Sequence, residues 1–467
     1  MKAKLFVLIT VIALVLTACA APAAPAPQPT AAPQPTAAPQ AAEPTKAPEP
    51  TAAPEPTKVP EPTAAPAAEP IELVYLVFES PVLTAEYWDN NIADAIKNAG
   101  LEGKVTVKKI VSPGIDRTTY AKQLLASGQL PDIMQSINTQ EFIDAGILTP
   151  WDSKWIEDNY LIPYGNALQG KVWQAPAGAQ IIPFFFYNTE MFEKAGVKPP
   201  TNWAEFQDVA KKLKDAGFKP LQLVGGGDAW ASSMLPSAFI AADVLGDTPD
   251  WVQKRKTGEV KFTDANMAAA WEKYAWLVEN GYVDKGDLGI GYADANRAFI
   301  NGEAAMYPMG SWFLQQAGKE AKFKPGVFLA PRDDGKVVVP FAVGGGTHIS
   351  AESKHPAEAM AFAQAFNTSP KMLADLIELD SLFPLLKGKK FEDYGVDVTA
   401  LMKEGMGYVD LPESIRVNGF GWTASDDALI AGMVDEVNKT AQTIITGGDY
   451  KAELDRLDKV WDSLAAD

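Results

Sequence analysis

A proline-rich tract near the start of the chain limits how much of it can fold. Residues 20–70 consist almost entirely of Pro, Ala, Thr, Glu and Gln, with a hexapeptide-like repeat marked by threonines such as Thr51, Thr57 and Thr63. This composition offers no apolar face whose burial could offset the entropy lost on ordering. Dense proline favours an extended polyproline II conformation, at about 3.1 Å per residue. We therefore expect residues 19–70 to be a disordered linker and the folded body to begin near Ile71.

The only cysteine, Cys19, lies directly before this tract. Two lysines precede an apolar run from Leu5 to Leu16, which leads into Leu-Thr-Ala-Cys. This is the order of a secretory signal peptide, and the last four residues resemble a bacterial lipobox. The resemblance implies that residues 1–18 are a signal peptide and that Cys19 carries a lipid. The alternatives are an ordinary secretory signal and a transmembrane helix, for which the run is short because spanning takes roughly 20 apolar residues.

Composition excludes several classes of function. The 467 residues carry a net charge of −18, which disfavours a nucleic-acid partner. With Cys19 lipidated, no thiol remains for a disulfide, a zinc site or a nucleophile. Only His348 and His355 could serve a histidine-dependent metal site or triad. We expect no cofactor and no bound metal. His348 follows a glycine run and is a weak candidate for ligand contact.

The folded body begins with alternating strand and helix patterns. Branched and aromatic residues predict strands at 71–78, 105–111 and 133–136, and helices are expected at 87–98 and 120–126. This alternation indicates an α/β fold with a mainly parallel sheet. Further helices are expected from about 203, where Asn202 and Glu205 would form a capping box, and at 264–280, 356–367, 370–377, 426–446 and 451–465.

Several short segments occur in a characteristic order between residues 120 and 350. They are Leu-Leu-Ala-Ser-Gly at 124–128 with Pro131-Asp132, Gly-Ile-Leu-Thr-Pro at 146–150, Gly-Lys-Val-Trp at 170–173, Met-Phe-Glu-Lys-Ala-Gly at 191–196, Pro-Thr-Asn-Trp-Ala-Glu-Phe at 200–206, Phe-Ile-Asn-Gly-Glu-Ala-Ala-Met at 299–306, Met-Gly-Ser-Trp at 309–312 and three glycines at 344–346. Together they resemble the bacterial extracellular solute-binding protein family 1, the maltose-binding-protein-like receptors of carbohydrate ABC importers.

The resemblance implies a periplasmic-binding-protein type II fold, with two α/β lobes and three inter-lobe crossings. By position, the crossings are expected near 180–184, 341–345 and 382–385. The N-terminal lobe would hold 71–183 and 346–384, and the C-terminal lobe 184–345 and 385–467. The implied function is non-catalytic: an extracytoplasmic, lipid-anchored monomer captures a carbohydrate in the cleft and delivers it to an ABC permease.

Tryptophans that follow loop signals are the leading ligand-binding candidates. Trp230, Trp312 and Trp422 each come after a glycine-containing loop. Aromatic rings stack on the apolar faces of sugars, and the resemblance implies that such aromatics face the cleft. The polar and glycine candidates follow strands or adjoin a tryptophan; they are Asp228, Asn138, Gln140, Glu79, Ser80, Gly344 and Gly345.

Two alternatives to a sugar receptor remain open. The same fold could bind a non-sugar solute such as a metal chelate, a polyamine or a peptide. A secreted glycoside hydrolase would suit the acidic, tryptophan-rich composition, and it would need two carboxylates about 5–10 Å apart.

Overall fold

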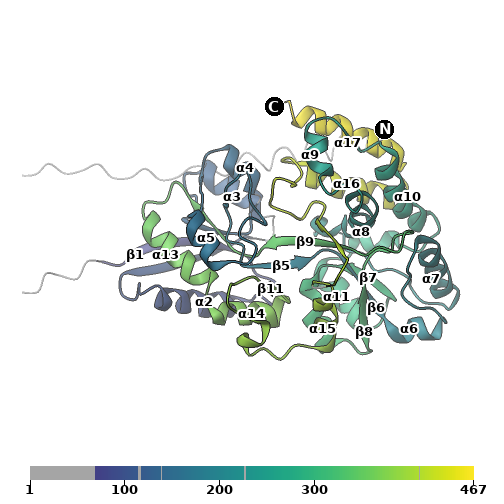
Figure 1. Cartoon of the computed structure of the whole chain (residues 1–467), viewed down its shortest axis with the longest axis horizontal. Coiled ribbons are helices and arrows are strands. Elements are labelled where there is room, and N and C mark those ends of the chain that lie inside the picture. Colours follow the sequence, from purple (N-terminus) through teal and green to yellow (C-terminus); the bar gives the residue numbers. More distant parts are fainter. Residues whose placement is uncertain (1–68, 114–116, 138, 226–227, 410, 467) are drawn as a thin grey trace, which may run out of the picture. The chain divides into compact units, whose positions relative to one another are not determined.

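The computed structural model describes residues 69–113, 117–137, 139–225, 228–409 and 411–466 (Figure 1). The expected signal peptide, Cys19 and nearly all of the expected linker lie outside these residues. The described chain forms three sheets. Their strands are β1 (Ile71–Val77), β2 (Val105–Val111), β3 (Ile133–Gln135), β4 (Leu148–Thr149), β5 (Gly178–Ile181), β6 (Phe184–Asn188), β7 (Met306–Met309), β8 (Pro325–Phe328), β9 (Val338–Gly344), β10 (Thr347–Ser350), β11 (Phe383–Pro384) and β12 (Ile415–Asn418).

The first sheet has the strand order β2-β1-β3-β10-β4. β1 pairs in parallel with both β2 and β3, and Leu73, Tyr75 and Leu76 are fully buried. A nearly continuous apolar run is typical of a strand covered on both faces. β10 runs antiparallel to β3 and β4. The expectation of a mainly parallel sheet is therefore correct only for the first three strands, because β10 enters from a distant part of the chain.

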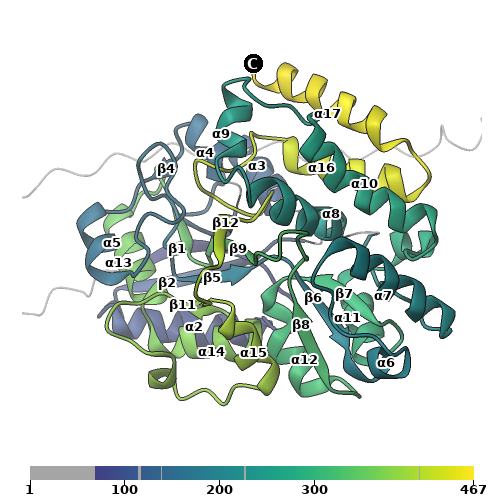
Figure 2. The ribbon, with the colours of Figure 1, turned by 45° about the vertical axis from the view of Figure 1, so that its right-hand side comes forward.

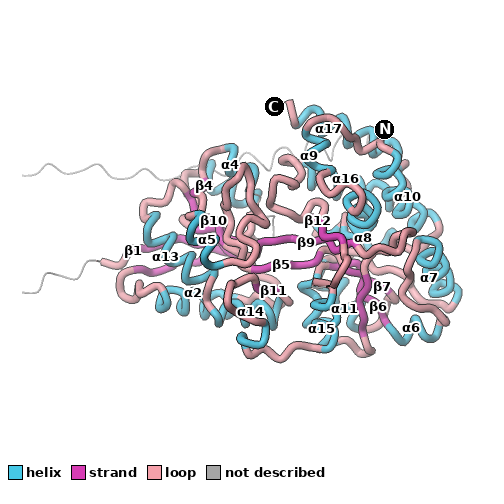
Figure 3. Tube along the Cα trace, viewed as in Figure 1, coloured by secondary structure: helices cyan, strands magenta, loops and turns pink. Residues whose placement is uncertain are grey.

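A central sheet joins strands that are far apart in the sequence, in the order β11-β5-β9-β12. β5 is antiparallel to β9, with Gly178 opposite Gly344, and antiparallel to β11, with Ala179 opposite Phe383. Figure 1 shows β5 and β9 side by side between the first sheet and the third. All three segments expected as crossings thus contribute a strand to one sheet. Long loops border this region, drawn in pink in Figure 3.

The third sheet, β7-β6-β8, is antiparallel throughout. Helices α7 (Trp203–Asp215), α10 (Ala265–Glu279), α16 (Met433–Ile445) and α17 (Tyr450–Leu464) pack into a large apolar cluster that includes Phe185 and Phe328 of this sheet. Figure 2 shows α10, α16 and α17 close together near the C-terminus. A second large cluster contains residues of all three sheets, including Tyr75, Phe186 and Val339. This second cluster therefore joins the three sheets through shared buried apolar surface.

The helices have the following bounds. The α-helices are α2 (Ala85–Asn98), α3 (Arg117–Ala126), α4 (Thr139–Asp144), α5 (Ser153–Asn159), α6 (Thr189–Lys194), α7 (Trp203–Asp215), α8 (Met234–Phe239), α9 (Trp251–Lys256), α10 (Ala265–Glu279), α11 (Tyr292–Ile300), α12 (Leu314–Glu320), α13 (Pro356–Asn367), α14 (Pro370–Asp380), α15 (Ala400–Gly407), α16 (Met433–Ile445) and α17 (Tyr450–Leu464). Short 3₁₀ helices are η1 (Ala229–Ala231), η3 (Lys285–Gly289), η4 (Ser311–Phe313) and η5 (Phe391–Tyr394), and η2 (Ile240–Leu245) is a π-helix.

Two local expectations need correction. Asn202 caps α7 by accepting a hydrogen bond from the Glu205 N–H at 2.9 Å. The Glu205 carboxylate, however, accepts from the N–H and hydroxyl of Thr201, so the capping box does not close on Asn202. The helix expected over 426–446 begins only at Met433. Gly432 precedes it with φ +80°, a left-handed conformation that ends the loop before α16.

Candidate ligand-binding site

Three half-buried tryptophans from distant loops touch one another. Trp230 lies in η1, Trp312 in η4, and Trp422 in the loop after β12. The ring centroids are 6.1 Å apart for Trp230 and Trp312, 5.8 Å for Trp230 and Trp422, and 5.9 Å for Trp312 and Trp422. The tryptophans that the sequence singled out are thus brought together. We call this set the tryptophan cluster.

Asp228 holds one wall of the tryptophan cluster in place. Its Oδ1 accepts from the indole N–H of Trp230 at 3.2 Å, and its Oδ2 accepts from the backbone N–H of Tyr292 at 2.7 Å. The ring of Tyr292 then lies 5.4 Å from that of Trp230. Asp228 therefore positions two aromatic rings. Tyr292 was missed in the sequence, where only its place after Gly291 gave a loop signal.

Trp312 is fixed to the central sheet on both sides. The hydroxyl of Ser311 accepts from the backbone N–H of Ile181 in β5 at 3.1 Å. Ser381, just before β11, donates to the Trp312 carbonyl at 3.3 Å and accepts from the Gln315 N–H at 2.8 Å. A movement of β5 or β11 should therefore change the position of Trp312.

Trp422 is tied to the same sheet through its loop. The backbone N–H of Gly419 donates to the carbonyl of Phe341 in β9 at 2.7 Å, and the Trp422 N–H donates back to Gly419 at 3.0 Å. Asn418 braces the loop by donating to the Asp427 carboxylate at 2.7 Å. Hydrogen bonds thus connect the segments that carry Trp312 and Trp422 to strands of the central sheet.

The polar candidates near the first sheet are more dispersed. Glu79 is exposed after β1. Ser80 uses its hydroxyl to accept from the Leu83 N–H at 3.0 Å, which forms a local turn. Gln140 is in α4 and donates to Asp144 at 2.7 Å. Asn138 lies outside the described residues. A ligand role for these side chains stays a prediction.

The glycine candidates lie where strands approach closely. Gly344 ends β9, and Gly345 has φ +79° and a carbonyl that accepts from Gln135 at 3.0 Å. A Cβ on Gly346 would overlap the carbonyl of Ala175. The glycine run therefore lets the backbone turn from β9 into β10 against neighbouring chain. A ligand contact at Gly344 or Gly345 stays a prediction.

His348 is fully buried in β10. Its Nε2 lies 2.9 Å from the hydroxyl of Thr139, the first residue of α4. Burial lowers the pKa of His348 to about 3, so the ring is neutral at ordinary pH. A buried ring of this kind positions the start of α4 rather than reaching a ligand directly.

One carboxylate beside the cluster escaped the sequence reading. Asp380 ends α14 and is half-buried. Burial raises its pKa to about 7, against the hydrogen bond from Gln180 and the charge of Arg117. No sequence signal marks Asp380, because its neighbours come from separate parts of the chain.

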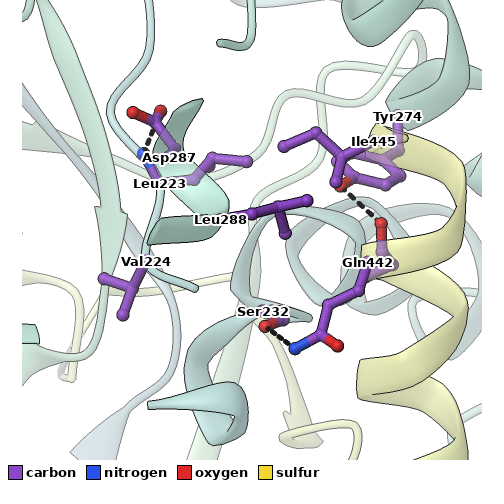
Figure 4. A pocket seen from close by; sticks show the side chains of 9 residues that line it. Leu223, Val224, Ser232, Tyr274, Asp287, Leu288, Gln442 and Ile445 are labelled. Carbon is purple, nitrogen blue, oxygen red and sulfur yellow. Dashed lines mark hydrogen bonds between the residues drawn. The ribbon is translucent and has the colours of Figure 1, made fainter. Parts of the chain in front are cut away.

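A pocket lined by residues of η3 and α16 is too small for a sugar. Figure 4 shows its lining between η3 and α16, including Leu223, Ser232 and Gln442, with Gln442 donating to Ser232 at 3.0 Å. Its volume of about 10 Å³ is no more than one water molecule needs. The tryptophan cluster is therefore the better candidate site.

Residues 102–372, more than half of the chain, match the family model of the bacterial extracellular solute-binding proteins. The chain belongs to this family. This solute-binding protein is similar to the multiple sugar-binding protein of Streptococcus mutans, with 25% identity over 381 residues that cover 78% of this chain and 89% of the relative. It is also similar to the alpha-glucosides-binding periplasmic protein AglE of Rhizobium meliloti, with 23% identity over 360 residues, covering 68% and 72%.

Solved structures show the fold of the solute-binding protein. A chitin oligosaccharide binding protein matches with a TM-score of 0.74 and 22% identity, covering 86% of this chain and 100% of that one. RafE in complex with raffinose matches with a TM-score of 0.65 and 22% identity, covering 85% and 100%. The expected two-lobed α/β fold is confirmed, and so is the expectation of a receptor rather than an enzyme.

Two properties of the described residues concern membranes and metal ions. No helix among them combines the length and apolar character that crossing a membrane requires. Within the same part of the chain, no group of three or more His, Cys, Asp or Glu side chains is arranged to hold a metal ion.

Proposed function

We propose that this solute-binding protein captures a carbohydrate, an oligosaccharide of two or more units, on the tryptophan cluster. The observation that carries the proposal is the contact among Trp230, Trp312 and Trp422, half-buried rings from three loops. Apolar ring faces of this kind stack on the C–H faces of sugars, and nearby polar groups bind the hydroxyls. The relatives named for sugars, alpha-glucosides, chitin oligosaccharide and raffinose support the same ligand class.

The lobe boundaries proposed from the sequence place the central sheet between the lobes. Residues 71–183 and 346–384 would form one lobe, and 184–345 and 385–467 the other. The pairing of β5 with β9 and β11 supports crossings near 180–184, 341–345 and 382–385. A few residues at such crossings absorb the dihedral changes when lobes close on a ligand. Gly344, Gly345, Glu79, Ser80, Gln140 and Asn138 remain proposed contributors to the cleft.

The proposed setting is the outer side of a membrane, with Cys19 as lipid anchor and residues 19–70 as tether. The protein would act as a monomer until it meets an ABC permease. The Cys19→Ala variant should be released from membranes and yet bind sugar with unchanged affinity, as measured by fractionation and titration. Loss of sugar binding in this variant would contradict the separation of anchor and site.

A fluorescence titration of the purified protein tests the ligand class. Raffinose, chitin oligosaccharides, maltotriose and monosaccharides are added in turn while tryptophan emission is recorded. Trp312→Ala should weaken the best sugar roughly 10- to 100-fold, since burying a large apolar side chain contributes about 1.5–3 kcal/mol and about 1.4 kcal/mol corresponds to tenfold. The matched control is Trp276→Ala, a half-buried ring that packs on Trp203 and Tyr282 instead.

Two results would overturn the proposal. One is a protein that responds to no sugar but clearly binds a peptide or a metal chelate. The other is a Trp312→Ala variant that binds sugar as tightly as the parent.

A further inference from the structure

Asp380 combines partial exposure with a shortage of hydrogen-bond donors. At the end of α14, it receives hydrogen bonds from the amide of Gln180 in β5, at 3.3 Å to Oδ2 and 3.4 Å to its backbone oxygen. None of the ion pairs within the described part of the chain includes it. A carboxylate has about four acceptor positions, so this one retains room for further donors.

The surroundings of Asp380 place it beside the tryptophan cluster. Its charge contributes to the raised pKa of Tyr292, although burial is the larger cause. Tyr292 packs on Trp230 with ring centroids 5.4 Å apart. The next residue, Ser381, donates to the carbonyl of Trp312. One residue therefore separates Asp380 from each of two tryptophans: Tyr292 lies between it and Trp230, and Ser381 between it and Trp312.

Groups from the first-sheet side also face Asp380. Tyr87 of α2 has a raised pKa, caused by burial first and then by the charges of Asp380 and Asp375. Arg117, which begins α3, lies 3.9 Å above the Phe78 ring and acts on Asp380 electrostatically. Asp375 itself is paired with Lys371 at 2.6 Å and accepts from the side chain of Asn91 in α2 at 2.9 Å. The charged and titratable groups around Asp380 therefore come from α2, α3, α11 and its own helix.

We propose that Asp380 is a further ligand-binding residue, whose carboxylate accepts hydrogen bonds from two neighbouring hydroxyl groups of the sugar that lies on the tryptophan cluster. This inference rests on the proposed sugar-binding function. It adds that the site selects sugars with two neighbouring hydroxyl groups. Two adjacent hydroxyls match the two oxygens of a carboxylate, and hydrogen bonds to a charged acceptor are stronger than those between neutral groups. Sugars that lack one of these hydroxyls would be bound less tightly.

Capture of the sugar would then release a proton. With its pKa near 7, a large fraction of unliganded Asp380 is protonated at neutral pH. Donors on the ligand favour the charged form and lower its pKa on binding. Affinity should therefore fall as pH decreases below about 7, by up to tenfold per pH unit, and level off above it, where the carboxylate is already ionised.

Calorimetry of the full chain with the tightest sugar of the panel tests this inference. Titrations at pH 6, 7 and 8 in buffers of different ionisation enthalpy measure the protons released. The parent should release a measurable fraction of one proton per sugar near pH 7. Asp380→Asn should bind at least tenfold more weakly at pH 8 and release no proton. Asp380→Ser replaces the carboxylate with a hydroxyl group, which can still accept a hydrogen bond but does not ionise. This variant should therefore also release no proton.

The matched control is Glu378→Gln, an exposed carboxylate two residues earlier on the same helix that pairs with Lys319. It should leave both affinity and proton release unchanged. Equal affinity and equal proton release in the parent and both Asp380 variants would overturn the inference while leaving the proposed function intact. A parent that binds no sugar would overturn the proposed function itself.

Discussion

The backbone N–H of Ile181 donates to the hydroxyl oxygen of Ser311 at 3.1 Å, although 130 positions separate the two residues. Both are fully buried. One belongs to the central strand β5, and the other immediately precedes a ring of the tryptophan cluster. This bond therefore connects the segment expected to bend with the surface expected to hold the ligand.

Replacing Ser311 with alanine should lower both stability and affinity. The N–H of Ile181 would lose its acceptor in a buried place, which costs about 1–3 kcal/mol. Urea unfolding should show that loss, and sugar titration should show weaker binding because Trp312 is less firmly placed. Ser127→Ala, at an exposed hydroxyl that donates to the Leu124 carbonyl at 3.0 Å, is the control. A variant as stable as the parent would mean that another group accepts the Ile181 hydrogen.

Asp228→Asn should disturb the cluster without removing a ring. Two N–H groups, from Trp230 and Tyr292, each use one oxygen of Asp228. An asparagine side chain has only one oxygen, so one of these donors must lose its partner, at a cost of about 1–3 kcal/mol. We expect a changed tryptophan emission spectrum and weaker sugar binding. Asp158→Asn, which breaks only an exposed pair with Lys154, should change neither. Unaltered emission from Asp228→Asn would argue against this positioning role.

Alanine should be tolerated at one glycine and not at another. At Gly346 a methyl group would overlap the Ala175 carbonyl and crowd Asn367, so Gly346→Ala should cost about 1–3 kcal/mol of unfolding free energy. At Gly407, the last residue of α15, no atom beyond its chain neighbours and its own helix backbone lies within 4 Å of the new methyl group. Gly407→Ala should be neutral or stabilise by up to about 1 kcal/mol. Thermal unfolding of the two variants measures the contrast, and equal shifts would contradict it.

His348 should make the protein less stable in mild acid. Its pKa is about 3 in the folded state because of burial, whereas an unfolded histidine titrates near 6.5. Between these values the unfolded state binds a proton that the folded state refuses, so stability decreases as pH falls from about 6.5 toward 3. Urea unfolding at pH 7, 6, 5 and 4 should show a steeper decline for the parent than for His348→Gln. Parallel curves would show that His348 does not contribute.

The sequence predicted the elements whose signals are local. The strand at 105–111 and the helix at 356–367 have the bounds that apolar pattern and an initial proline indicate. The loops before Trp230, Trp312 and Trp422 were recognisable from their glycines, although their mutual contact was not. The place where the three rings meet depends on the pairing of β9 with β12. These strands are far apart in the sequence, so no short segment predicts that pairing.

Other features depend entirely on long-range packing. The surroundings of the Asp380 carboxyl group include Gln180, Tyr292 and Arg117, which are far from it in the chain. The antiparallel entry of β10 beside β3 could not be inferred from the alternation that precedes it. The helix expected from residue 426 begins seven residues later, at Met433, and the skipped residues lie in a loop where Ser425 and Asp427 bond Asn418.

The pairing of β5 with both β9 and β11 has a practical consequence for following the protein at work. Strands joined by backbone hydrogen bonds cannot rotate independently, so the three proposed crossings should move as one twisting ribbon. Opening would then be a motion with a single degree of freedom. One pair of spectroscopic labels, one on each side of the ribbon, would be enough to report it in a single molecule.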